Sequence, residues 1–252
     1  MNAGDMAGLK VVQVSDCHVS SDPDADYRGF RAGRMLESML PAIRGFQPDL
    51  LLLTGDVSED ASRESYGRVS ALLCSLGAPV LALPGNHDDP CVMKRYFPRG
   101  PWAGPQFHGK KSWEMVLLDS GGRSEIAGRF SETTLDQLEI GLAACHSEHI
   151  LVALHHQPVE VGSPWIDKYP LQDPGPFMDI LKADARVRCV AWGHVHQDFS
   201  AHRDGMQLLG APSTVANGIP GREKFTPDVA GPACRWLLLG RDGSVETGLL
   251  RP

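Results

Sequence analysis

Five short clusters of metal-binding residue types follow strand-like hydrophobic segments, and their fixed order constrains the fold of this chain more than any other feature. The segments are 9–14, 50–54, 80–83, 150–154 and 187–191. After them come Asp, His and Asn residues, namely Asp16 and His18, then Asp56, then Asn86 and His87, then His155, then His194 and His196. Because strand ends on one edge of a sheet converge in space, we expect these side chains to meet and form a site for metal ions.

Helical patterns alternate with the strand-like segments. Apolar residues recur at helical spacing over 32–46 and 63–76, and Ser131 has the character of a helix N-cap. Further along the chain, Asp204-Gly205 and Asp242-Gly243 are turn signals between alternating runs, which is typical of hairpins. The pattern predicts an α/β fold with a mixed, two-layered sheet and helices outside it.

The composition limits the domain organisation and the partners. The 252 residues, 42% of them hydrophobic and 22% charged, suit one domain over 1–252, with a loose tail at 1–8. The net charge is −7 and no basic stretch offsets it, so we expect no nucleic-acid partner. We also expect no membrane partner, because no signal peptide precedes the fold and no apolar run approaches the roughly 20 residues needed to span a bilayer. Six scattered cysteines without a CxxC pair indicate reduced thiols in a cytoplasmic protein.

The clusters contain ligands for two metal ions. Asp16 and His18 are two residues apart, so in an extended strand end they point the same way, and Cys17 between them points away. The two carboxylate oxygens of Asp56 can bridge two metals. Seven ligand positions are too many for one first-row ion, and carboxylate with imidazole suits Mn, Fe, Zn or Ni. Two metals about 3.5–4 Å apart can lower the pKa of a bridging water and support attack on phosphorus.

His87 has a different predicted role. It follows Asn86, so its side chain diverges from the ligand and can protonate the leaving oxygen or steady the transition state. Such a histidine needs an acidic neighbour to orient it. We expect that neighbour to be Asp60, or failing that Glu59.

The segment 157–176 is rich in Pro and Gly and is expected to form a loop over the site. Its residues Trp165 and Tyr169 can supply an apolar wall for a base. No Arg or Lys lies beside the motifs in the sequence to take up the second charge of a phosphomonoester, which favours a diester. Each motif alone also has a purely structural explanation, because DxH, GD or GHxH can be a plain turn. His156 is expected to face away from the site. All five motifs in this order favour a functional site.

At these residues the chain resembles the calcineurin-like metallophosphoesterases, whose pattern is DxH, GD, GNH[DE], a lone His and GHxH. The resemblance runs from Leu9 to about Asp198. Within that superfamily it is most similar to the bacterial class III cyclic-nucleotide phosphodiesterases, the cyclic-AMP phosphodiesterase A group. The similarity lies in HHQP at 155–158, the following SPWIDKYPL, and GAPST at 210–214. It implies a four-layered α/β/β/α sandwich and an Fe/Mn or similar dinuclear centre, with Zn, Ni or Co as alternatives.

The resemblance also implies roles for single residues. One metal would be held by Asp16, His18, Asp56 and His196, and the other by Asp56, Asn86, His155 and His194, with His87 as the catalytic histidine. This chain departs from the pattern at Ala127-Gly128, where many relatives carry His-Gly. The segment 215–228 also differs, so the base pocket of the relatives is not carried over.

We therefore expect a cytoplasmic dinuclear phosphodiesterase that hydrolyses a small anionic phosphodiester, best 3′,5′-cyclic AMP to AMP, by attack of a metal-bridging hydroxide on phosphorus. An alternative is a broader phosphodiesterase or monoesterase acting on 2′,3′-cyclic nucleotides or phospholipid-derived esters. A UDP-sugar-lipid hydrolase would need a basic amphipathic insertion, which this chain lacks. A catalytically silent protein-binding scaffold would have lost ligands, whereas all seven positions and His87 are filled.

Overall fold

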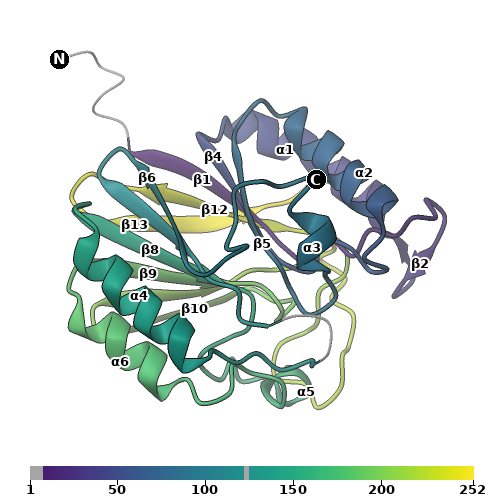
Figure 1. Cartoon of the computed structure of the whole chain (residues 1–252). Helices are drawn as coiled ribbons and strands as arrows, with labels where there is room; N and C mark the ends of the chain where they lie inside the picture. Colours follow the sequence, from purple (N-terminus) through teal and green to yellow (C-terminus); the bar gives the residue numbers. More distant parts are fainter. Residues whose placement is uncertain (1–7, 122–124) are drawn as a thin grey trace.

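A computed structural model describes residues 8–121 and 125–252, so the expected tail at 1–8 lies, apart from Gly8, outside the described residues. Two sheets are stacked on each other, with helices on both outer faces (Figure 1). The first sheet has the spatial order β13 (Val245–Leu250), β12 (Cys234–Leu239), β1 (Leu9–Val14), β4 (Leu50–Thr54) and β5 (Val80–Leu83). Strands β1, β4 and β5 are parallel, whereas β12 runs antiparallel to β1.

The second sheet is built in the same mixed way. Its order is β10 (Phe199–Arg203), β11 (Met206–Gly210), β9 (Val187–Trp192), β8 (His149–Leu154), β7 (Trp113–Leu117) and β6 (Gln106–Lys110). The four central strands are parallel, and the two edge strands are antiparallel to their neighbours. A separate small hairpin joins β2 (Asp26–Tyr27) to β3 (Phe30–Arg31).

The helices lie on both outer faces of the stacked sheets. In Figure 1, α1 (Ala32–Phe46) and α2 (Arg63–Cys74) cover the first sheet, while α4 (Glu132–Ala144) and α6 (Gly175–Ala183) cover the second. Two short helices, α3 (Pro90–Met93) and α5 (Pro164–Asp167), lie in the connections.

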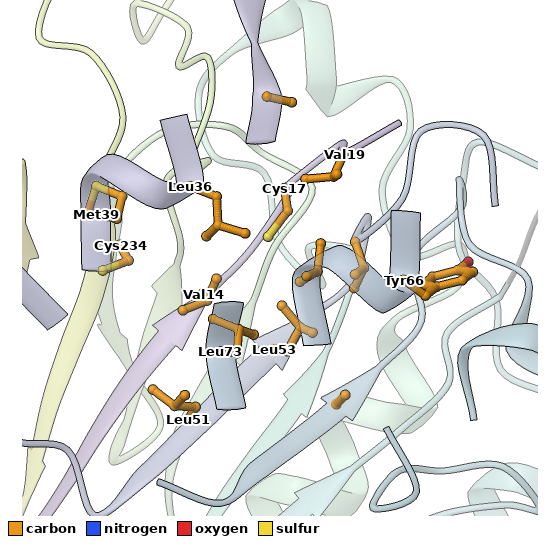
Figure 2. Packing of buried hydrophobic residues seen from close by; sticks show 14 of the residues in the cluster. Val14, Cys17, Val19, Leu36, Met39, Leu51, Leu53, Tyr66, Leu73 and Cys234 are labelled. Atoms are coloured by element: carbon orange, nitrogen blue, oxygen red, sulfur yellow. The ribbon is translucent and has the colours of Figure 1, made fainter. Parts of the chain in front are cut away.

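The alternation of side chains along the strands produces these layers. On β4, Leu50 and Leu52 belong to the core between the two sheets, whereas Leu51 and Leu53 pack toward the helices. Figure 2 shows Leu51 and Leu53 near Leu73 of α2, with Val14 at the end of β1 close by. Because successive strand residues face opposite ways, one fully apolar strand joins two layers of core. The predicted α/β/β/α sandwich with mixed sheets is confirmed.

The predicted helices and turns are confirmed, with small changes at their ends. Helix α1 has the predicted bounds, and α4 begins after Ser131, whose hydroxyl accepts a hydrogen bond from the backbone N–H of Thr134. Helix α2 ends at Cys74, two residues before the predicted end. The turn glycines Gly205 and Gly243 have φ of 81° and 82°, in the left-handed region that hairpin turns require.

Other segments differ from expectation. The expected loop over 157–176 contains α5 and the start of α6, and neither β6 nor the β2–β3 hairpin was predicted. Within the described residues, no helix is both long and apolar enough to cross a membrane.

Candidate metal centre

The predicted ligands converge at one edge of the two sheets. They follow the carboxyl ends of the parallel strands β1, β4 and β5 in the first sheet and β8 and β9 in the second. This edge of a parallel sheet is where α/β proteins bind ligands, because the loops leaving the strands are free to carry functional residues. Cys17 points away, as predicted, into the core beneath α1 (Figure 2).

The backbone of this site is strained at the predicted ligands. Five of them have positive φ, namely Asp16 (52°), His18 (43°), Asp56 (49°), His194 (66°) and His196 (47°). Non-glycine residues rarely adopt this conformation, and such residues cluster at functional sites. Asp16 and His18 therefore lie in a left-handed turn after β1, and not in the extended strand end that we expected from the sequence.

Four of the predicted ligands lie around the shared carboxylate Asp56. Its Oδ2 atom lies 3.6 Å from His18 Nε2 and 3.5 Å from His155 Nε2. On one side, His196 Nε2 lies 3.4 Å from Asp16 Oδ1 and 3.3 Å from His18 Nε2. Asp56 therefore stands between the two predicted ligand sets, where a bridging carboxylate would have to be.

The hydrogen bonds on the outer side of the rings fix which nitrogen faces inward. Three histidines contact an oxygen through Nδ1: His155 the Thr54 carbonyl at 2.7 Å, His196 the Ala216 carbonyl at 2.8 Å, and His18 the Glu59 carboxylate at 2.7 Å. A carbonyl or carboxylate oxygen only accepts, so each Nδ1 carries a hydrogen and each Nε2 is the ring nitrogen that faces the cluster. The Nε2 lone pairs of His18 and His196 face each other beside two carboxylates, and such a cluster of acceptors fits metal cations.

The second set is completed by Asn86 and His194. Asn86 Oδ1 lies 3.2 Å from His155 Nε2, and the ring centres of His155 and His194 are 5.0 Å apart. His194 Nε2 donates to the Tyr169 carbonyl at 3.1 Å, which leaves its Nδ1 as an acceptor. All seven predicted ligands are thus brought together, and together they could hold two metal ions.

The electrostatics of the cluster favour positive charge. Burial alone would raise the pKa of Asp56, but His155, with which it is hydrogen-bonded, and His18 hold that pKa well below its ordinary value. Burial lowers the pKa of His155, but the charge of Asp56 and its hydrogen bond to His155 outweigh burial and raise that pKa to about 9. Asp56 therefore stays ionised, and a buried ionised carboxylate favours a cation beside it.

His87 is oriented by Glu59, the second of the two predicted partners. The distance from His87 Nδ1 to Glu59 Oε2 is 3.1 Å. Asp60, the first choice, accepts hydrogen bonds from the backbone N–H groups of Ser21 and Ser62, and Glu59 is the carboxylate that contacts the His87 ring. Burial lowers the pKa of His87, but the hydrogen bond to Glu59 and the charge of Asp56 outweigh it and raise the pKa to about 9.

His156 lies behind the metal-binding groups as a buried structural residue. Its Nε2 donates to the Ile126 carbonyl at 3.0 Å, so its Nδ1 accepts from the Ser120 hydroxyl at 2.8 Å. Burial and the charge of His155 lower its pKa to about 3. Gly128, after the divergent Ala127, packs so closely that an added Cβ would lie 2.5 Å from His156 Nδ1.

A cavity of about 260 Å³ opens above this cluster. Its lining includes predicted ligands and His87, together with Trp165, Ile166 and Tyr169 from the 157–176 segment, as expected. Sequence reasoning missed three further lining residues, namely Ile126 and the hairpin residues Tyr27 and Arg28. No Arg or Lys is adjacent to the motifs in the sequence, as expected, but the fold brings Arg28 beside them.

The sandwich and its cluster of convergent Asp, Asn and His side chains define a metal-dependent hydrolase of phosphate esters. The chain belongs to the calcineurin-like phosphoesterase family, whose model matches residues 9–198. The predicted family and the predicted metal-dependent phosphoesterase activity are confirmed, and this family implies two metal ions.

Proteins similar to this chain include two bacterial enzymes and one solved structure. A 3′,5′-cyclic adenosine monophosphate phosphodiesterase CpdA of Pseudomonas aeruginosa is 37% identical over 247 residues, covering 97% of this chain and 90% of that protein. A probable cyclic nucleotide phosphodiesterase of Synechococcus is 35% identical and covers 84% of this chain and 83% of that protein. A dimetal phosphatase from Danio rerio, 17% identical, has the same fold with a TM-score of 0.71, covering 97% of this chain and 99% of that one.

Proposed function

We propose that this chain hydrolyses a small phosphodiester and that 3′,5′-cyclic AMP is its substrate, with AMP as the product. The carrying observation is the group of inward-facing carboxylate, amide and imidazole groups around Asp56, which lies in one cavity with the aromatic residues Trp165 and Tyr169. The similarity to proteins named cyclic-AMP and cyclic-nucleotide phosphodiesterases supports the choice of substrate.

The shape of the cavity suits a nucleotide. A phosphate needs positive charge around its oxygens, and a base needs flat apolar surfaces. Asp56 and the histidines line a cavity of about 260 Å³ together with Trp165 and Tyr169. We propose that the phosphodiester lies beside Asp56 and the nucleoside lies against Trp165 and Tyr169.

Two bound metal ions would supply an activated water and neutralise the charge on the phosphate. The seven residues that would hold them are Asp16, His18, Asp56, Asn86, His155, His194 and His196. Asp, Asn and His ligands suit iron and manganese, which we propose as the metals. The six free cysteines fit the reducing cytoplasm, where we place the protein.

We propose that His87 donates a proton to the leaving oxygen. Glu59 occupies its Nδ1 atom at 3.1 Å, which leaves Nε2 as the atom that can reach a substrate. His87 also lines the cavity beside Asp56, close to where the phosphorus would be attacked. Glu59 fixes the ring and favours its charged form, as an acidic partner does for a catalytic histidine.

The test is a comparison of matched substrates with the manganese-loaded protein. The kcat/KM values are measured for 3′,5′-cyclic AMP, 2′,3′-cyclic AMP and AMP, with release of each product followed directly. We expect 3′,5′-cyclic AMP to be the fastest and AMP the slowest. Faster release of phosphate from AMP would overturn the diester proposal, and a preference for 2′,3′-cyclic AMP would overturn the choice of substrate alone.

A further inference from the structure

The β2–β3 hairpin is anchored over the metal-binding cluster. Arg28 and Gly29 form its turn, with φ of 54° and 89°, and the Asp26 side chain accepts a hydrogen bond from the Gly29 N–H at 3.0 Å. Two central residues with positive φ are the signature of a tight hairpin turn. The Tyr27 ring lies flat on the ring of His18, with centres 4.1 Å apart and planes 12° apart. The tip of the hairpin is therefore held at the cavity by contact with a predicted ligand.

The guanidinium of Arg28 is held in place without an acidic partner. It lies 3.9 Å from the centre of the Phe225 ring, and its Nε–H donates to the Tyr27 hydroxyl at 3.2 Å. Within residues 8–121 and 125–252, no carboxylate forms an ion pair with Arg28, whereas its neighbour Arg31 faces Asp24 and Asp26. The remaining N–H donors of Arg28 are thus available to a ligand, and stacking on an aromatic face lowers the entropy cost of using them.

Phe225 joins this arrangement to Trp165, an aromatic residue that lines the cavity. Its ring meets the edge of Trp165 with centres 5.1 Å apart, and it lies 6.3 Å from the ring of His196. Arg28 therefore lies against the aromatic pair of Phe225 and Trp165, the surface against which we place the nucleoside. Among the described residues, it is the single Arg or Lys that lines the cavity.

We propose that Arg28 recognises the nucleobase of the substrate, donating hydrogen bonds to acceptor atoms of the base while Phe225 holds the guanidinium plane. This inference rests on the proposed nucleotide function and adds to it the residue that reads the base. Arg28 is a binding residue, and Phe225 is a positioning residue that acts through it. A hydrogen bond from a charged donor changes affinity by about 10–100-fold.

The test is calorimetric titration of the manganese-loaded protein with two ligands that differ in the base alone, AMP and ribose 5-phosphate. Arg28→Met should weaken AMP by about 10–100-fold and ribose 5-phosphate by less than about threefold. Arg28→Lys, which keeps the charge but loses the planar fork, should restore only part of the affinity. Arg31→Met removes the same charge from the same hairpin and should leave both ligands unchanged.

Equal weakening of both ligands would overturn the proposal, because Arg28 would then act on the phosphate. It would also be overturned if Arg28→Met left AMP binding unchanged, or if the wild-type protein bound AMP no better than ribose 5-phosphate. Phe225→Leu should weaken AMP as well, and the double variant should lose less than the sum of the two single losses. If the losses of AMP affinity were additive, Phe225 would not act through Arg28, and the stacked geometry would have no role in binding.

Binding and turnover separate this inference from the proposed function. If the wild-type protein binds AMP through Arg28 but does not hydrolyse 3′,5′-cyclic AMP, the proposed function fails and the inference stands. If it hydrolyses 3′,5′-cyclic AMP and Arg28→Met changes neither binding nor KM, the inference fails and the function stands. Unchanged metal content in each variant shows that the site itself is intact.

Discussion

Single residues in this site depend on partners that hold their rings from outside. Glu59 is the clearest case, because one carboxylate contacts His18 Nδ1 at 2.7 Å and His87 Nδ1 at 3.1 Å. It thereby fixes a predicted metal ligand and the predicted proton donor in one geometry. Loss of such an outer partner typically costs metal sites 10–100-fold, by order of magnitude, in affinity or activity.

His87→Ala should keep both metals and lose about 10²–10⁴-fold in turnover of diesters with an alkoxide leaving group. The loss should be smaller for nitrophenyl esters, since that leaving group needs little protonation. The measurement is kcat on both ester types, together with metal content. Asp60→Asn is the matched control, and it should change turnover far less because Asp60 holds the loop and not the His87 ring. A loss that is equal across leaving groups would leave His87 without an acid role.

At this scale the sequence predicted the residue types but not every partner. All seven predicted ligands converge because each follows a strand end, which is a feature that periodicity can detect. The sequence could not decide between Asp60 and Glu59, because the two are adjacent and only the path of the turn after Asp56 decides which one faces His87. Arg28 was missed because it is distant from every motif along the chain, and a hairpin of two-residue strands brings it near.

Among the elements, the turn between β4 and Asp56 is packed against its neighbours. Gly55 has φ of 91°, and an added Cβ would lie 2.4 Å from His155 Nδ1 and 2.7 Å from the Gly85 nitrogen. Glycine is required here both for the backbone conformation and for the close approach of β5 and β8. This close packing is what allows ligands from both sheets to reach one point.

Gly55→Ala should therefore destabilise the fold by about 2–4 kcal/mol, more than the roughly 1–2 kcal/mol that a left-handed alanine costs by itself. It should also lower metal content, since His155 must move. Gly77→Ala is the control, because Gly77 has φ of 75° with nothing within 4 Å of an added Cβ. Denaturant unfolding of both variants measures the difference. Equal losses for the two variants would show that the contact with His155 is unimportant.

The elements that could be predicted are those with a clear apolar period. The strands β1, β4 and β5 and helix α1 have their predicted bounds, since each is a continuous or regularly spaced apolar segment. Strand β6 is an edge strand whose residues are partly buried or exposed, so its sequence lacks that signal. Helix α5, with four residues, is too short for a helical period to appear.

In the whole molecule, the core between the sheets sets their separation and hence the relative position of ligands from β4 and β8. Leu52 is fully buried in this core. Leu52→Ala should cost about 2–5 kcal/mol of stability, through lost burial and a residual cavity. Ile140→Ala, at a site on α4 that is 69% exposed, should change stability by less than about 0.5 kcal/mol. Chemical denaturation of both gives the comparison, and a cost for Leu52→Ala as small as that of the control would argue against a tightly packed interlayer.

The shared position of Asp56 between the two ligand sets is the central claim, and the metal content of Asp56→Ala tests it most directly. Elemental analysis of the wild-type protein should give two metal ions per chain. The Asp56→Ala variant should lose both ions and nearly all hydrolysis of a nitrophenyl diester, because each set loses a ligand. Asp136→Ala, which removes an exposed carboxylate on α4, serves as the control and should keep both. An Asp56→Ala protein that retains two metal ions per chain would contradict the account.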